Sequence, residues 1–113
     1  MRTAVGLTLL CFMSFPCFGD DMSVSDFKLK RGAPATREYV AGIGEGMDFL
    51  NYQFAKAGRD PLFCVPSGLK LNADNYLNVL DQELARDPKK NSGLRPLVAS
   101  MVDGLRVTFP CKH

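Results

Sequence analysis

The chain has 113 residues, with 14 lysines and arginines against 12 aspartates and glutamates, and a formal net charge of +2. This length leaves room for one small domain. A charge so close to balance does not favour nucleic acid or an anionic lipid surface as the partner.

The first 19 residues have the three-part layout of a secretory signal. Arg2 supplies an early positive charge, an apolar run follows through Phe15, and the small residues Cys17 and Gly19 stand near its end. This pattern predicts cleavage before Asp20 and a periplasmic mature protein. A membrane anchor is the alternative, but the apolar run is shorter than the ~20 residues that a membrane span needs.

Cysteine usage also bears on function. Cleavage removes Cys11 and Cys17 and leaves Cys64 and Cys111. An even number of cysteines in an exported chain indicates a disulfide, so we predict a Cys64–Cys111 bridge. A catalytic thiol needs a base nearby, but the sole histidine, His113, is the last residue. The sequence offers neither a Ser/His/Asp arrangement nor a set of metal ligands, so we predict no enzymatic activity, no metal and no cofactor.

Residues 20–35, "DDMSVSDFKLKRGAPA", mix charge with Gly and Pro and show no sustained period. They predict a loose N-terminal arm with one short turn of helix at most. Residues 36–113 then form the predicted helical domain, so that the chain divides into a signal peptide (1–19), an arm (20–35) and this domain.

The first periodic stretch begins at Thr36, which is a suitable N-cap, and Gly58 is a suitable stop. Its apolar residues recur at spacings of three and four, which predicts an amphipathic helix. They are Tyr39, Ile43, Met47, Leu50 and Phe54. The opposite, polar face carries one aromatic ring, Tyr52, which we expect to face water.

Two further helices are predicted by the same periodicity. One runs from Asn72, as cap, to Arg86, with Pro88 as terminator. The other runs from Ser92 to about Thr108, with its apolar residues on one side. These are Leu94, Leu97, Val98, Met101, Val102 and Leu105. The sequence therefore predicts an all-α fold, a small bundle of three main helices, with room for a short N-terminal helix and with one disulfide.

The segment "AGIGEGM", residues 41–47, superficially resembles a phosphate-binding glycine loop. Such a loop follows a strand and opens a helix, whereas these glycines lie inside a helical period. Each glycine should cost about 1 kcal/mol in a helix interior, so the cluster needs a reason. We expect Gly42 and Gly46 to allow the close approach of another helix or of a partner. Glu45 and Asp48 are interpreted as part of a solvated face.

Four segments, in order, resemble the Tai-type family, the periplasmic immunity proteins against type VI secreted cell-wall amidases. They are "REYVAGIGEGM", "LFCVPSG", "YLNVLDQELARDP" and "LVASMVDGLRVTFPC". The Cys-x-Pro loop and the Phe-Pro-Cys terminus are together the most specific of these motifs. The resemblance implies an all-helical fold, a bridge between Cys64 and Cys111, homodimers, and inhibition of an amidase by blocking its catalytic cleft. The chain lacks two further cysteines that members often carry before and at the start of the first helix.

An amidase inhibitor must present groups that reach into a cleft. The segment "ARDPKKNSGLR", residues 85–95, is the favoured plug, with Lys89, Lys90 and Asn91 as exposed polar contacts. An ordinary solvated connection between two helices is the alternative for this segment. Tyr52 is the second predicted partner contact, because exposed aromatic residues are enriched among interface hot spots. Two other functions stay open: an HdeA-type periplasmic acid-stress chaperone, and an envelope protein with no toxin partner.

Overall fold

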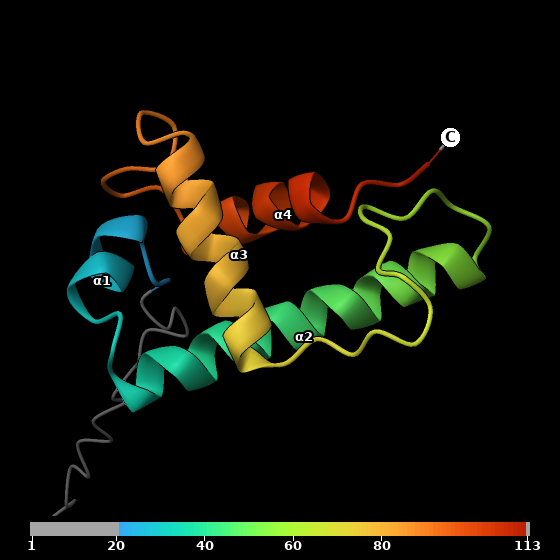
Figure 1. The fold of residues 1–113 in the computed structure, drawn as a ribbon, viewed down its shortest axis with the longest axis horizontal. Helices are drawn as coiled ribbons and strands as arrows, with labels where there is room; N and C mark the ends of the chain where they lie inside the picture. The colour runs from blue at the N-terminus through green and yellow to red at the C-terminus, as the bar shows by residue number, and fades with distance from the viewer. Residues whose placement is uncertain (1–20, 113) are drawn as a thin grey trace, which may run out of the picture.

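A computed structural model describes residues 21–112 of the chain (Figure 1). It contains four helices, α1 (Val24–Leu29), α2 (Pro34–Lys56), α3 (Ala73–Arg86) and α4 (Leu97–Thr108). Over this range the one β-type pairing is an isolated bridge between Ser23 and Pro96. The predicted all-α bundle of three main helices with a short N-terminal one is confirmed. The predicted signal peptide and His113 lie outside the described residues.

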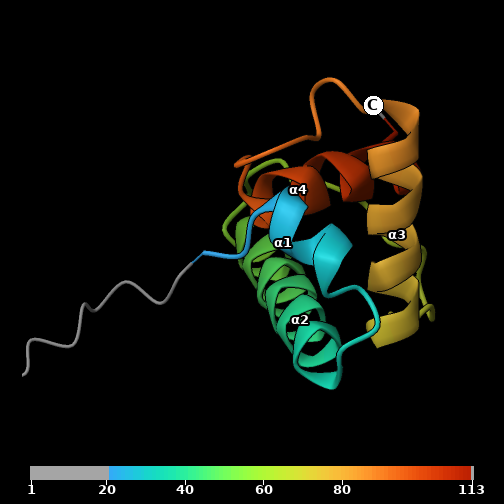
Figure 2. The same cartoon turned by 90° about the vertical axis from the view of Figure 1, so that its left-hand side faces the viewer.

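Helix α3 is the centre of the fold. It runs across both α2 and α4, and α1 lies beside this assembly near the start of α2 (Figures 1 and 2). The core draws on all four helices and on one loop residue. Its buried apolar side chains are Val24, Phe27, Val40, Phe63, Tyr76, Leu77, Val79, Leu80, Leu84, Leu97, Met101 and Leu105.

Two predicted helix ends are confirmed. At the start of α3, the Asn75 amide donates to Asn72 Oδ1 at 3.0 Å and the Asn72 amide donates to Asn75 Oδ1 at 2.9 Å. This reciprocal pair satisfies two amides that the first turn leaves without helical partners. Helix α2 ends at Lys56, and Gly58 follows with φ of 74°, a left-handed conformation that glycine adopts without strain.

The start of α2 differs from the prediction. The helix begins at Pro34, after Ala33 as N-cap, and Thr36 is buried inside its first turn rather than capping it. Proline suits this first position because its missing amide proton has no helical partner there and its φ is already helical.

The N-terminal segment contains the short helix that the sequence left room for, α1, and this helix packs into the core instead of lying in a loose arm. Ser23 caps α1, and its hydroxyl accepts from the Asp26 amide at 3.1 Å. Val24 and Phe27 of α1 are fully buried in the core. Residues 23–27 therefore belong to the helical domain. The burial of this helix was hard to predict from the sequence, because the helix is short and only two apolar residues, three apart, anchor it.

Helix α4 begins at Leu97, five residues later than predicted. The preceding residues pair with the start of α1 instead: the Val24 amide donates to the Arg95 carbonyl at 2.9 Å, and the Ser25 amide donates to the Gly93 carbonyl at 3.0 Å. Gly93 has φ of 61°, which interrupts any helix there. Leu94, predicted to face the core, is 89% exposed as a result.

The face that α2 turns to the core is shifted from the predicted stripe. Val40, Gly44 and Asn51 are buried, whereas Leu50 is 47% exposed. Tyr39, Ile43 and Met47 are half-buried and form one edge of this face. The prediction used only large apolar residues, so it did not identify a buried face whose centre includes a glycine and an asparagine.

The prediction that another helix approaches Gly42 and Gly46 is also corrected. Gly42 and Gly46 have open space where a side chain would begin, and the helix that approaches α2 does so at Gly44. A methyl carbon placed on Gly44 would lie 2.5 Å from the ring of Tyr76 on α3. Gly104 of α4 allows a similar close approach to Val79 of α3.

Candidate partner-binding surface

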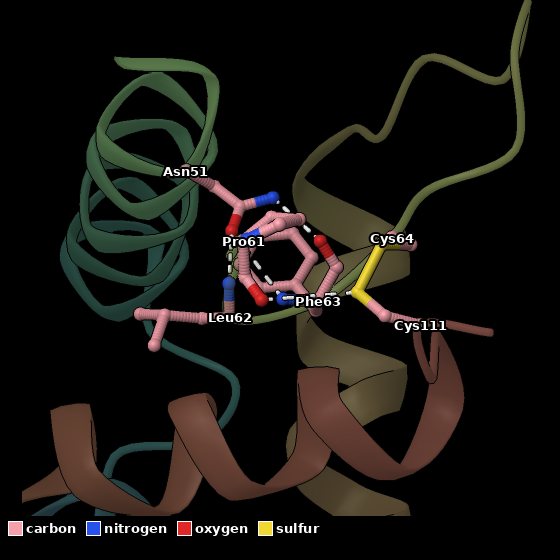
Figure 3. Close-up of a disulfide and its surroundings, with 6 residues drawn as sticks. All are labelled: Asn51, Pro61, Leu62, Phe63, Cys64 and Cys111. Atoms are coloured by element: carbon pink, nitrogen blue, oxygen red, sulfur yellow. Dashed lines mark hydrogen bonds between the residues drawn. A yellow bond between two sulfur atoms is a disulfide. The ribbon is translucent and has the colours of Figure 1, made fainter. Parts of the chain in front are cut away.

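The predicted Cys64–Cys111 disulfide is present, with the two Cα atoms 4.9 Å apart. It joins the loop of residues 57–72, here called the cysteine loop, to the segment that follows α4 (Figure 3). Beside it, the Cys64 amide donates to the Phe109 carbonyl at 2.8 Å. The covalent bond and the hydrogen bond together fix the middle of the loop against the C-terminal end of α4.

A second anchor of the cysteine loop is the side chain of Asn51. Projecting from α2, its Nδ2 donates to the Phe63 carbonyl at 2.6 Å, and its Oδ1 accepts from the Leu62 amide at 2.6 Å (Figure 3). Phe63 itself is buried in the core. Buried backbone groups in a loop need such partners, because an unpaired one loses its bonds to water without replacement. The loop is therefore attached to α2 and to α4 at neighbouring residues.

Asn51 was missed by sequence reasoning. The available signal was its position seven residues after Gly44 and four after Met47, on the side of the helix that faces the core. A lone amide on such a side indicates a side chain that bonds to nearby backbone.

A groove of about 830 Å³ lies between α2 and the cysteine loop, and we call it the α2 groove. Its α2 wall is built from residues three or four apart, which share one side of the helix. The groove is lined by Glu45, Asp48, Phe49, Tyr52, Val65, Pro66, Gly68, Leu69, Lys70, Leu71 and Tyr76.

Large apolar side chains of the α2 groove face solvent. Phe49 is 64% exposed, Tyr52 is 60% exposed and Leu69 is 48% exposed. The expectation that the Tyr52 ring faces water is confirmed. Clustered apolar side chains that remain in contact with water are typical of sites where another molecule binds.

The α2 groove also carries negative charge. Glu45 and Asp48 take part in none of the ion pairs found among residues 21–112. Burial, with the added charge of Asp48 and then of Glu45, raises the pKa of the Tyr76 hydroxyl to about 12. Lys70 is the one basic residue of the lining. The negative charge of the two carboxylates therefore acts on Tyr76, the side chain at the crossing of α2 and α3.

The connection between α3 and α4, residues 87–96, contains the other predicted contacts. Lys89 is exposed, and Lys90 Nζ lies 2.5 Å from Asp103 Oδ2 of α4. The Lys90 ammonium is the main reason why the pKa of the Asp103 carboxyl lies below its usual range, and Arg95 adds to the effect. Lys89 is thus the lysine of this pair whose charge is free of an ion pair within the described range.

The prediction that Asn91 is exposed is wrong. Asn91 is fully buried; its Nδ2 donates to the Asp87 carbonyl at 3.0 Å, and its Oδ1 accepts from the Ser100 hydroxyl at 2.7 Å. It also donates to Glu83, whose carboxylate binds Arg86 as well. The amide therefore holds the connection against α3 and α4, and it is not available to a partner.

The structure does not bring all the predicted contacts together. Tyr52 lines the α2 groove, whereas Lys89 and Lys90 do not. The connection that carries the lysines leads into the start of α4, and the cysteine loop is joined to the segment after its end (Figure 1). The surface thus offers two candidate contact regions at opposite ends of α4.

Residues 21–112 contain no group of three or more side chains placed to hold a metal ion. Within the same range, none of the helices has the length and apolar character needed to cross a membrane. Comparisons of the chain with known protein families, with curated proteins and with solved structures find no match.

Proposed function

We propose that the chain is a periplasmic immunity protein, which binds a type VI secreted peptidoglycan amidase and inhibits it by blocking its active-site cleft. One observation carries the proposal. The two most specific motifs of the resemblance, Cys64-Val65-Pro66 and Phe109-Pro110-Cys111, lie side by side, linked by the disulfide and by the bond from the Cys64 amide to the Phe109 carbonyl.

The order of the two candidate contact regions before any partner binds supports the same proposal. A stoichiometric inhibitor binds more tightly when its contact surface is already ordered, because less conformational entropy is lost on association. Here the disulfide and Asn51 hold the cysteine loop, and Asn91 holds the connection that presents Lys89. Both contact regions therefore have support from the core beneath them.

The test uses purified type VI secreted cell-wall amidases as candidate partners, each tested in turn. Purified protein is added to the amidase acting on peptidoglycan, and released cross-link fragments are measured. We expect inhibition that is complete at a fixed molar ratio, with light scattering of each protein and of the complex showing whether one chain or a homodimer binds. An amidase of a different specificity serves as the control and should stay active.

Full amidase activity in the presence of excess folded protein would contradict the proposal. The acid-stress alternative is tested in parallel, by following aggregation of a client enzyme at about pH 2, where carboxylates are protonated. Client protection without amidase inhibition would replace the immunity function by the chaperone function.

A further inference from the structure

The α2 groove combines apolar walls with an acidic side. Its apolar part comes from both walls, with Phe49 and Tyr52 on α2 and Leu69 on the cysteine loop, all well exposed. A volume of about 830 Å³ lies within the range of sites that hold ligands of several side chains' size. The groove can therefore cover more than one apolar side chain of an incoming segment.

The charges of the groove favour a positively charged residue next to the apolar side chain of the incoming segment. Glu45 and Asp48 are three residues apart, one turn of α2, so that both carboxylates can approach the same cation. On α3, by contrast, the carboxylate of Asp74 is paired with Arg37, and that of Asp81 with Arg31 at 2.7 Å. The lining sets one basic residue, Lys70, against these two carboxylates, so a lysine or arginine of a partner would supply the remaining positive charge.

Aromatic residues stand directly beside these carboxylates. Phe49 follows Glu45, and Tyr52 follows Asp48, by four residues along α2, and both rings line the groove. The faces of aromatic rings attract cations, and the long stem of a lysine or arginine covers apolar surface while its charged end stays at the carboxylates. Arginine is favoured, because its planar guanidinium both stacks on rings and binds carboxylates through two bonds.

The walls are held in place before anything binds. Asn51 lies between Asp48 and Tyr52 in the sequence of α2, and its amide bonds to the backbone of Leu62 and Phe63 on the cysteine loop. The helix wall and the loop wall are thus connected by hydrogen bonds beside the groove itself. Little conformational entropy of the groove is therefore lost when a segment binds.

We propose that the α2 groove is the docking site for a segment of a partner protein in which an apolar side chain lies next to an arginine or lysine. This site goes beyond the immunity function, because it requires only a protein partner with that chemistry and no amidase cleft. Charge complementarity and the exposed apolar walls together identify the occupant.

The test is a nuclear magnetic resonance titration of the isotope-labelled protein with three probes. The first is a short synthetic peptide of alternating leucine and arginine, the second has glutamate in place of arginine, and the third is spermidine, which carries positive charge without apolar side chains. We expect saturable shifts with the arginine peptide at the amides of residues 45–52 and 65–71, and far weaker effects of the other two probes.

Matched variants then separate the groove from general electrostatic attraction. Glu45→Lys combined with Asp48→Lys should lower the affinity for the arginine peptide by at least about tenfold, which corresponds to 1.4 kcal/mol of binding free energy. Glu38→Lys is the control: it makes one such charge change on α2, at an exposed residue outside the groove. The affinity of this variant for the arginine peptide should stay within about twofold of the wild-type value. Tyr52→Ala should weaken binding, whereas Leu29→Ala, at an exposed residue of α1, should not.

Three results would overturn the proposal: no saturable shift with the arginine peptide, equal binding of the glutamate peptide or of spermidine, or shifts centred outside the groove. All the substituted side chains are exposed, so the amide spectrum of each variant reports directly whether the fold is intact. Because no amidase is used, failure of this test leaves the outcome of the inhibition experiment unaffected.

Discussion

The ring of Tyr76 lies directly against Gly44, where α3 crosses α2. A Cβ atom on Gly44 would approach three ring carbons to between 2.5 and 2.6 Å, which is closer than non-bonded carbons come. The ring is buried and fixed by the core around it. This relationship explains one of the three closely spaced glycines of α2, and it makes the other two useful controls.

Gly44→Ala should destabilise the protein, and Gly42→Ala should not. The methyl group at Gly44 forces α2 and α3 apart, and such overpacking costs about 1–3 kcal/mol. At Gly42 the space is open, so alanine should stabilise the helix by up to about 1 kcal/mol. Urea unfolding followed by circular dichroism measures both. Equal effects of the two changes would show that the helices do not meet at Gly44.

Tyr76 should make stability fall at high pH. The pKa of its hydroxyl is raised to about 12 in the folded protein, against about 10 in an unfolded chain. The folded state therefore favours the protonated phenol; this contribution is complete below about pH 10 and is lost as pH rises to about 12. Tyr76→Phe should remove it, so the stability of wild type relative to this variant declines across that interval.

The measurement is urea unfolding of both proteins at several alkaline pH values, with the ultraviolet absorbance of tyrosinate followed in parallel. Lysines titrate in the same range, but they are common to both proteins and cancel in the difference. A difference in stability that stays constant from about pH 9 to pH 12 would contradict the raised pKa.

Asn51→Ala should loosen the cysteine loop. The change leaves the Phe63 carbonyl and the Leu62 amide without their partner, and a buried polar group left unpaired costs about 1–3 kcal/mol. Hydrogen exchange at Leu62 should become faster, while exchange in the middle of α3 changes only with global stability. Gln53→Ala, at an exposed amide two residues further along α2, is the control. Unchanged exchange at Leu62 would show that the loop is held by other contacts.

The elements that sequence patterns predicted well are those whose signals are local. Asn72 caps α3 through its own side chain, and Gly58 ends α2 through its own backbone, so each signal and its effect lie within a few residues. The disulfide is different: it joins residues 47 apart, and it was predictable because the exported chain was expected to retain two cysteines.

The features that escaped prediction depend on contacts between distant segments. The late start of α4 follows from bonds to the backbone at residues 22–25, which compete with a helical turn at 93–96. Asn91 is polar and lies in a connection between helices, both of which are typical of exposed residues, yet Ser100 of α4 and Glu83 of α3 surround it. The α2 groove likewise requires the position of the cysteine loop, which no periodicity of α2 contains.

Removal of the disulfide should cost a large share of the stability. In the chain-entropy treatment, a bridge across 47 residues removes unfolded-state entropy worth about 4 kcal/mol, out of a total of about 5–15 kcal/mol for a domain. Replacing both Cys64 and Cys111 by serine should therefore lower the melting temperature sharply. Alkylation of the protein purified without reductant should label neither residue. Quantitative labelling of both, with unchanged melting, would contradict the bridge.

The final prediction concerns the proposed amidase interface, and it separates the two lysines of the connection. Tyr52→Ala should weaken amidase binding by about 2 kcal/mol, because an exposed aromatic of this kind is a typical hot spot. Lys89→Ala should weaken it by about 1 kcal/mol without changing stability, since Lys89 is exposed and makes no ion pair with residues 21–112. Lys90→Ala also breaks the pair with Asp103, so it should lower stability as well.

Calorimetric titration of the amidase with each variant gives the affinities, and urea unfolding of the free variants gives the stabilities. Lys28→Ala, at an exposed residue of α1, is the matched control for Lys89 and should change neither. Asn91→Ala should lower stability, because its amide bonds inside the protein, while any loss of affinity follows from loosening of the connection. Losses below about 0.5 kcal/mol for Tyr52, Lys89 and Lys90 alike, with folding intact, would place the interface elsewhere on the molecule.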